Sequence, residues 1–301
     1  MATTKRRTAE GPPPGERRSR ASTGGPEKEP EEPEEREKEG EEEPQLNSAF
    51  ERTITEGTHR LTRTWPGLLA TGAVGGIDVS AGLLGLLLVE QATGNALLAA
   101  LAFGIGFVAL TLAGSELFTE NFLVPIVAVA AGRSNLRSLA RLWFGTAATN
   151  LLAGWVMAWI IVTAEPKLKP TAIKVAEVYP KLGIGLHSFA LAVLGGVVIT
   201  LMTWMERSTV SVPGKIVAAM SAAFLLAAGA LDHAIIVSLE MFAALHAGAP
   251  FGYLVWFKVM LWAAFCNMLG GVGLVTVLRL VQVGRRKIQE EEDKAAAGEP
   301  V

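Results

Sequence analysis

The sequence predicts an all-α membrane protein with six transmembrane helices, and three observations support this: long apolar runs, polar interruptions within two of them, and motifs that recur in both halves. Half of the 301 residues are hydrophobic, and the mean hydropathy is +0.36. Much of the charge lies near the two ends of the chain. Crossing a bilayer takes about 20 apolar residues, and the central part of the chain offers several runs of that length.

The six apolar runs cover residues 65–89, 96–131, 142–163, 184–205, 212–247 and 251–283. The second and the fifth are too long for one straight crossing, and polar residues interrupt them at 114–121 and 229–240. Polar backbone at membrane depth is tolerated only where it is buried in protein or lines a water-filled cavity. Broken helices of this kind mark binding or conduction sites in transporters, so we expect helices 2 and 5 to be broken at a transport site.

The regions outside the apolar runs differ in character. Residues 1–45 are rich in Pro, Gly, Glu and Arg, and 11 of the 17 residues over 27–43 are Glu, which predicts a disordered acidic tail. Residues 46–64 carry Phe50, Ile54 and Leu61 among polar side chains and predict an amphipathic helix at the membrane interface. A channel domain over 65–284 and a short C-terminal tail over 285–301 complete the predicted organisation.

The distribution of Lys and Arg predicts the orientation in the membrane. With six crossings, both termini lie on one side, and that side carries most of the basic residues of the short loops, which favours cytoplasmic termini in the inner (plasma) membrane. One loop on the opposite side carries Lys167, Lys169, Lys174 and Lys181. These four lysines predict either a solvated loop or a positive vestibule that concentrates anions.

The two halves of the chain repeat short motifs at an offset of about 117–120 residues. The pairs are Gly75-Gly76 with Gly195-Gly196, and Asn150-x-x-x-Gly154 with Asn267-x-x-x-Gly271. Each repeat would hold three crossings, an odd number, so the second copy is expected to be inverted in the membrane. Asn150 and Asn267 have two readings, because a Gly lets helices approach and an Asn can bond across them: helix packing or support of the pathway.

The first interruption, over residues 114–121, carries groups suited to an anion. Leu117, Phe118 and Thr119 stand where the backbone leaves the helix, so that free amides and the Thr119 hydroxyl can donate hydrogen bonds. Phe118 is expected to act as a hydrophobic gate. Glu116 and Glu120 are expected to cap helices or to pair with nearby arginines, since exposed carboxylates would repel an anion.

The second interruption contains Asp232, His233 and, further on, Glu240. An ionisable side chain inside the membrane is a functional candidate, and histidine titrates near physiological pH. We therefore expect His233 to line the path and to exchange a proton with a weak acid in transit. Asp232 and Glu240 are expected to support the pathway or the packing around it.

These motifs together resemble the formate/nitrite transporter family over residues 60–285. The resemblance lies in Gly114-Ser115-Glu116-Leu117-Phe118-Thr119-Glu120-Asn121, Arg141-x-Trp143 followed by Asn150, Asp232-His233, and Asn267-x-x-Gly270-Gly271. It implies an aquaporin-like six-helix protomer in a homopentamer, with one pathway in each protomer. It also implies transport of small monovalent anions such as formate, nitrite, acetate, lactate or hydrosulfide, commonly with proton coupling.

The resemblance also assigns roles to residues. It places Leu117, Phe118 and Thr119 in a mobile loop with the inner constriction, and it makes His233 the central histidine. Extending the match along the helices puts the constrictions at Phe103, Phe107, Ile199 and Leu226. The chain departs from the family pattern at Gly196, where better-known members carry an Asn, so it is similar to a divergent branch whose substrate is not assumed to be formate or nitrite.

Two other functions stay open at this point. A neutral small-solute channel of aquaporin type fits the architecture, although the paired Asn-Pro-Ala boxes are absent from the sequence. A membrane sensor or scaffold whose tail binds a partner also fits. An enzyme is not expected, because no metal cluster, nucleophile triad or phosphate loop can be recognised, and the sequence predicts no cofactor and no nucleic-acid partner. The expected partners are the anion, membrane lipid and further copies of the chain.

Overall fold

The computed structural model describes residues 33–299, so most of the predicted acidic tail over 1–45 lies outside the described residues. The chain divides into two units, and the second unit begins at Glu42. The first helix, α1 (Pro33–Thr62), begins within the predicted tail and continues through the segment predicted as an amphipathic helix. Its apolar residues Ala49, Phe50 and Ile54 are buried, and its position at a membrane interface stays a prediction.

Five helical segments of the described chain are long and apolar enough to cross a membrane. They are α2 (Trp65–Thr93), α3 (Ala96–Ala113), α5 (Leu136–Ala164), α8 (Leu186–Ser208) and the continuous helix Tyr253–Val283, which comprises α11 (Tyr253–Met268), the π-helical η3 (Leu269–Thr276) and α12 (Val277–Val283). Each has few charged residues over its apolar stretch. These five segments correspond to five of the six apolar runs in the sequence.

Three shorter apolar helical segments cover the end of the second run and the fifth run. The first comprises the 3-10 helix η1 (Phe118–Phe122) and α4 (Val124–Ala130), which follow α3, and the other two are α9 (Val212–Ala228) and α10 (Ala234–Ala247). α3 ends at Gly114, whose φ of 66° favours glycine. Between α9 and α10 lies Ala230, with a φ of 45° that an alanine rarely adopts. Both helix ends lie within the interruptions seen in the sequence.

Short helices connect the longer ones. Between α5 and α8 lie η2 (Pro166–Leu168), α6 (Lys169–Ala176) and α7 (Val178–Leu182). α6 packs against α10. The last helix, α13 (Arg285–Ala296), follows Gly284 and is joined to α1 by the Lys287–Glu51 ion pair, with 3.1 Å between Nζ and Oε1.

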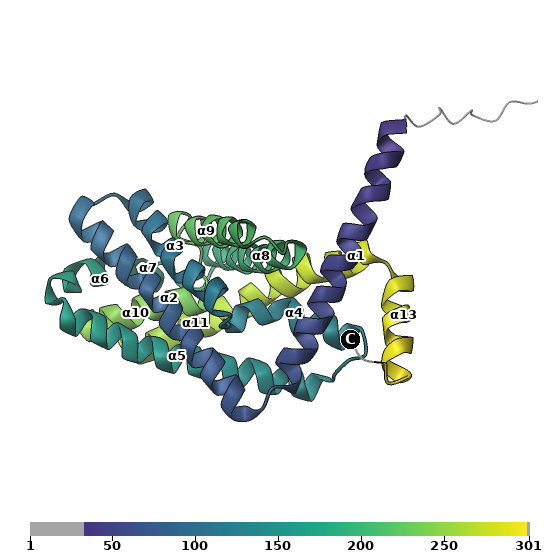
Figure 1. Ribbon diagram of the computed structural model, residues 1–301. Coiled ribbons are helices and arrows are strands. Elements are labelled where there is room, and N and C mark those ends of the chain that lie inside the picture. The colour runs from purple at the N-terminus through teal and green to yellow at the C-terminus, as the bar shows by residue number, and fades with distance from the viewer. Residues whose placement is uncertain (1–32, 300–301) are drawn as a thin grey trace, which may run out of the picture. The chain divides into compact units, whose positions relative to one another are not determined.

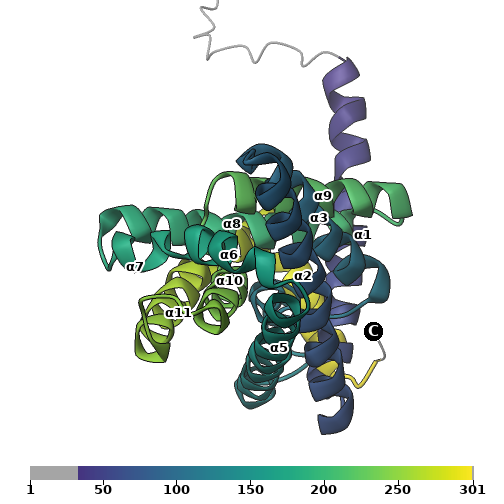
Figure 2. The ribbon, with the colours of Figure 1, turned by 90° about the vertical axis from the view of Figure 1, so that its left-hand side faces the viewer.

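The long helices of the second unit pack side by side as a bundle (Figures 1 and 2). α2 packs against α3 and α5, α3 against α9, α10 against α5, and α8 against α9, α11 and η3. Glycines permit the closest approaches, because a methyl group at Gly76 or Gly196 would overlap the main-chain carbonyl of Asn150 or Asn267. Close packing of this kind is what holds helices together in lipid.

Candidate functional site

Asn150 of α5 binds the backbone of the first interruption. Its Nδ2 donates to the carbonyl oxygens of Gly72 in α2 at 2.6 Å and Glu116 at 2.9 Å. Its Oδ1 accepts from the backbone N–H of Phe118 at 2.8 Å. The side chain is fully buried, where an unmatched backbone group would be costly, so Asn150 satisfies polar groups that the helix leaves open at its break.

Asn267 of α11 makes the same three kinds of bond in the second interruption. Its Nδ2 donates to the carbonyl oxygens of Ala192 in α8 at 2.6 Å and Asp232 at 2.8 Å. Its Oδ1 accepts from the backbone N–H of Ala234 at 2.9 Å. Each of the two asparagine side chains therefore joins helices and also binds the backbone of an interruption, and a role of either residue in the pathway stays a prediction.

The two interruptions meet at Thr119 and His233. Thr119 Oγ1 and His233 Nε2 lie 2.6 Å apart, and both side chains are fully buried. Thr119 comes from η1 and His233 is the N-cap residue of α10. The sequence predicted a role for each residue; their direct hydrogen bond across 114 positions of the chain is a structural finding.

The other ring nitrogen of His233 determines the direction of this bond. Nδ1 accepts from the backbone N–H of Ile236 at 3.4 Å, as a helix cap does. A neutral imidazole with Nδ1 as acceptor carries its proton on Nε2. The ring therefore donates to the Thr119 hydroxyl.

The residues predicted at the constrictions lie in one buried apolar cluster. Phe103, Phe107, Ile199 and Leu226 all belong to it, and Leu117 packs there too. The Phe103 and Phe107 ring centroids are 5.7 Å apart. Phe118 is only partly buried, and its ring packs edge-on against the rings of Phe122 and Trp143.

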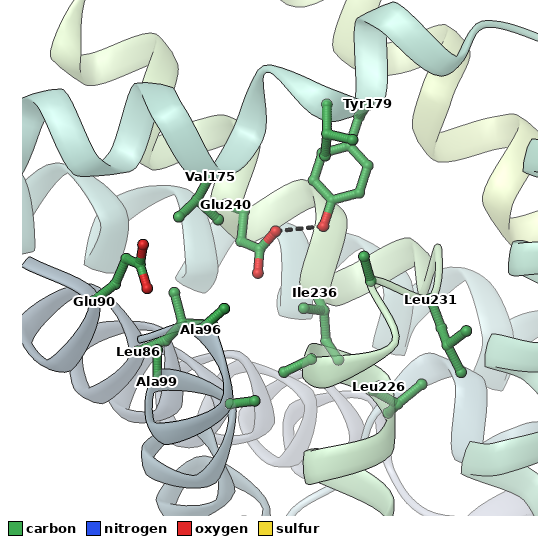
Figure 3. A pocket seen from close by; sticks show the side chains of 14 residues that line it. Leu86, Glu90, Ala96, Ala99, Val175, Tyr179, Leu226, Leu231, Ile236 and Glu240 are labelled. Carbon is green, nitrogen blue, oxygen red and sulfur yellow. Dashed lines mark hydrogen bonds between the residues drawn. The ribbon is translucent and has the colours of Figure 1, made fainter. Parts of the chain in front are cut away.

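Two cavities lie at opposite ends of α3. The first, here called the Glu240 cavity, has a volume of about 140 Å³ (Figure 3). It is lined by Ala96, Ala99 and Ala100 of α3 and by residues of α2, α6, α7, α9 and α10, among them Glu90, Tyr179, Leu226, Ile236 and Glu240. Leu226 is thus both a predicted constriction residue and part of this cavity wall.

The second cavity, here called the Arg60 cavity, has a volume of about 280 Å³. It is lined by Leu110, Thr111 and Gly114 at the other end of α3, by His59, and by the acidic and basic residues Glu56, Arg60, Arg63, Glu120, Glu206, Arg207 and Lys215. Phe103 and Phe107 lie along α3 between the two cavities, on the buried face that also carries Ala99 and Leu110.

Thr119 and His233 line neither cavity, but a residue near each of them in the chain lines one. Glu120, next to Thr119 in the chain, lines the Arg60 cavity, and Ile236, three residues after His233, lines the Glu240 cavity. The Thr119–His233 hydrogen bond therefore joins a residue next to one cavity with a residue one helical turn from the other.

The carboxylates of the first interruption are bound by arginines of α1 and the residues just after it. Glu116 Oε1 lies 2.6 Å from Arg63 Nη1 and 3.3 Å from Arg60 Nε. Glu120 Oε2 lies 3.9 Å from Arg60 Nη1 and accepts from the Leu117 backbone N–H at 3.2 Å. The prediction that these carboxylates pair with nearby arginines is confirmed.

Arg60 is a site residue that the sequence analysis did not single out. It is 4% exposed. Burial alone would lower the pKa of its guanidinium, but the carboxylates of Glu116, Glu120 and Glu56 outweigh burial and raise that pKa above its ordinary value. Its Nη1 also donates to Asn121 Oδ1 at 3.0 Å. A buried arginine needs such partners, and it holds the charged side chains of the first interruption together.

The second interruption has fewer charged partners. Asp232 is 4% exposed, and its Oδ1 has no hydrogen-bond partner. Glu240 is buried on α10, and it accepts a short hydrogen bond from the Tyr179 hydroxyl (Figure 3). Tyr179 and Glu90 were not predicted from the sequence, although a carboxylate just beyond the apolar run 65–89 was a visible signal for Glu90.

Three of the four loop lysines pair with carboxylates. Lys174 Nζ lies 2.8 Å from Glu90 Oε1. Lys167 pairs with Glu165 at 3.1 Å, and Lys181 pairs with Glu177 at 3.0 Å. This pairing favours the reading of a solvated loop over that of a positive vestibule.

Within residues 33–299, no group of three or more His, Cys, Asp or Glu side chains is arranged to hold a metal ion.

Comparisons with known proteins point to one family. The model of the formate/nitrite transporter family matches residues 47–281. The inner membrane protein YfdC of Escherichia coli (strain K12) is 26% identical over 272 residues, which cover 82% of this chain and 83% of that protein.

Two solved structures share the fold. A structure described as an FNT family ion channel superposes with a TM-score of 0.67 at 16% identity, covering 76% of this chain and 96% of that one. A pentameric formate channel with formate bound superposes with a TM-score of 0.58 at 18% identity, covering 71% of this chain and 95% of that one.

Proposed function

The chain belongs to the formate/nitrite transporter family, and we propose that it carries the small monovalent anions of weak acids across the inner membrane. One observation carries this proposal: Thr119 and His233 form a hydrogen bond, and Glu120 and Ile236, near them in the chain, line two cavities at opposite ends of α3. The structural neighbour with formate bound supports a substrate of this class. Which weak acid is carried is a question for the experiment below.

We propose six crossings arranged as an inverted repeat, with both termini in the cytoplasm. In this arrangement α3, η1 and α4 make one broken crossing, and α9 with α10 makes another. The matching hydrogen bonds of Asn150 and Asn267 support the repeat, because each binds a neighbouring helix and the two sides of a break. We also propose a homopentamer, on the strength of the pentameric formate channel that shares the fold.

The charge of the substrate makes its passage through the proposed path energetically costly. A bare anion loses its hydration shell in a narrow apolar passage at large cost, whereas the neutral acid does not. The passage proposed here runs past Phe103, Phe107, Ile199 and Leu226, all of which belong to the buried apolar cluster. A proton donor next to this cluster lets the substrate pass as an uncharged molecule.

We assign that role to His233. When the ring takes up a proton at Nδ1, it gives up its long 3.4 Å bond to Ile236 and becomes an imidazolium. The imidazolium passes one proton to the anion, which crosses as the neutral acid and releases the proton to water beyond the constriction. Thr119 holds the ring with Nε2 facing the first interruption, and Leu117 and Phe118 form the adjoining part of the constriction.

Uptake into proteoliposomes tests the proposal. Labelled formate, nitrite and glycerol are offered to vesicles that contain the wild-type protein or the His233→Ala variant, over a range of external pH. Formate or nitrite uptake by the wild type should rise as pH falls, and His233→Ala should reduce it by about tenfold or more, as expected for loss of a proton-transfer group.

The His246→Ala variant is the matched control, because His246 lies on the same helix but stacks on Trp155 near the end of α10. Its uptake should equal that of the wild type. Unchanged flux with an unchanged pH dependence in His233→Ala would rule out the assigned role. Uptake of glycerol in place of formate and nitrite would favour the neutral-solute channel instead.

A further inference from the structure

The Glu240 cavity contains two carboxyl groups in a path proposed for anions. Glu240 of α10 and Glu90 of α2 both line it, and both side chains point into it (Figure 3). They are 5% and 9% exposed. Most of the remaining wall is apolar, with Leu86, Ala96, Ala99, Val175, Leu226 and Ile236.

The partners of these carboxyl groups leave part of their charge uncompensated. Glu240 accepts from the Tyr179 hydroxyl, a neutral donor. Glu90 Oε1 lies 2.8 Å from Lys174 Nζ, but the Lys174 side chain is 67% exposed and its charge is shared with water. Glu90 Oε2 is buried and has no hydrogen-bond partner. The remaining acid in the neighbourhood, Asp232, adds negative charge.

The cavity lies against the same face of α10 that carries His233. His233, Ile236 and Glu240 are separated by three and four residues, so they lie along one face of the helix. Seven residues of helix place Glu240 about 10 Å from His233 along the axis. A substrate that passes His233 and Leu226 therefore reaches the Glu240 carboxyl next.

We propose that the Glu240 cavity is a charge filter that binds a small weak acid in its neutral, protonated form and excludes the ionised anion. The neutral acid donates its acidic O–H to a carboxylate oxygen, for which the free Glu90 Oε2 is placed. An anion there meets two carboxylates and one exposed ammonium. The proposal rests on the transport function proposed above and specifies the form in which the substrate passes this end of the path.

The two cavities then have complementary tasks. The Arg60 cavity is lined by the cationic residues Arg60, Arg63, Arg207 and Lys215 as well as by carboxylates, so an anion can enter there. The anion gains a proton before it reaches Glu240 and leaves together with that proton. Transport through the wild-type protein is accordingly electroneutral.

A measurement of charge movement tests the filter. Proteoliposomes containing the wild type or Glu240→Gln are given a formate gradient, and a potassium diffusion potential is imposed with valinomycin. Wild-type formate flux should not respond to the potential. Glu240→Gln removes one negative charge while its amide oxygen still accepts from Tyr179, so formate flux should become potential-dependent, with a current about tenfold above that of the wild type.

Two further variants separate charge from packing. Glu177→Gln removes an exposed carboxylate that pairs with Lys181 on the same loop but does not line the cavity, and its flux should match that of the wild type. Tyr179→Phe removes the hydrogen-bond donor to Glu240 but keeps both carboxyl groups of the cavity, so its formate flux should stay independent of the imposed potential.

The outcomes distinguish the two proposals. If wild-type vesicles take up no weak acid, the transport function itself fails. If they take up the acid but wild-type flux follows the potential, or Glu240→Gln leaves the current unchanged, the charge filter is overturned while transport stands.

Discussion

The two interruptions share a backbone arrangement and differ in the chemistry of their side chains. Asn150 binds the carbonyl of Glu116 and the N–H of Phe118, and Asn267 binds the carbonyl of Asp232 and the N–H of Ala234. An acidic residue thus stands at the same place in each. Glu116 is paired with two arginines, whereas Asp232 Oδ1 has no hydrogen-bond partner.

This comparison separates the residues that shape the two interruptions from the residues that differ between them. The bonds of the asparagines are alike in both interruptions, so they define the shape of the breaks. The residue that follows the acid differs, since it is Leu117 in one interruption and His233 in the other. We infer that the function depends on the side chains that differ between the two interruptions, such as Leu117 and His233. The stability depends on the two asparagines, whose hydrogen bonds are alike.

Replacing either asparagine should have the largest effect on stability. Asn150→Ala and Asn267→Ala each remove three buried hydrogen bonds and leave backbone groups unmatched, which should cost about 3–5 kcal/mol. The melting temperature of the detergent-solubilised protein measures this loss. The two variants should be affected alike, and a tolerated replacement at one site with a severe effect at the other would contradict the equivalence of the two breaks.

Neutralising Glu116 and Asp232 should reduce stability to different extents in the two interruptions. Glu116→Gln leaves Arg63 and Arg60 without their shared carboxylate and should cost roughly 3 kcal/mol, as breaking buried pairs does. Asp232→Asn loses no ion pair within the described residues and should cost less than about 1 kcal/mol. Thermal melting of both variants compares them, and equal losses would mean that the arginines do not distinguish the interruptions.

Adding a methyl group at close helix contacts should cost less stability than the replacement of either asparagine or of Glu116. Gly76→Ala and Gly196→Ala each place a Cβ against the carbonyl of the asparagine on the partner helix, and such overpacking typically costs 1–3 kcal/mol, here about 2. Gly185→Ala is the control, because a Cβ there has open space. A loss at Gly185 as large as at Gly76 would show that the close approach is not what matters.

Much of the helix arrangement could be predicted from apolar length. Five of the six runs contain a helix able to span a membrane, and the ends of α3 and α9 fall where polar residues interrupt the second and the fifth runs. The helices α6 and α7 could not be read from hydropathy, since they lie in a polar loop and depend on packing, α6 against α10. The start of α1 at Pro33 was likewise not expected.

The candidate site could be predicted only in part, because its partners are far apart in the sequence. Local motifs pointed to Thr119, His233 and the two asparagines. The roles of Arg60 and Tyr179 depend on contacts across 56 and 61 positions, with Glu116 and Glu240, and no local pattern encodes those. The constriction roles of Phe103, Phe107, Ile199 and Leu226 stay predictions.

The coupling between Thr119 and His233 tests the central claim most directly. Formate uptake is measured for Thr119→Val, His233→Ala and the double variant in the same proteoliposomes. If the hydrogen-bonded pair acts as one unit in proton transfer, the double variant should be no slower than the slower single variant. Losses that simply multiply would show that the two residues act independently and would contradict the account.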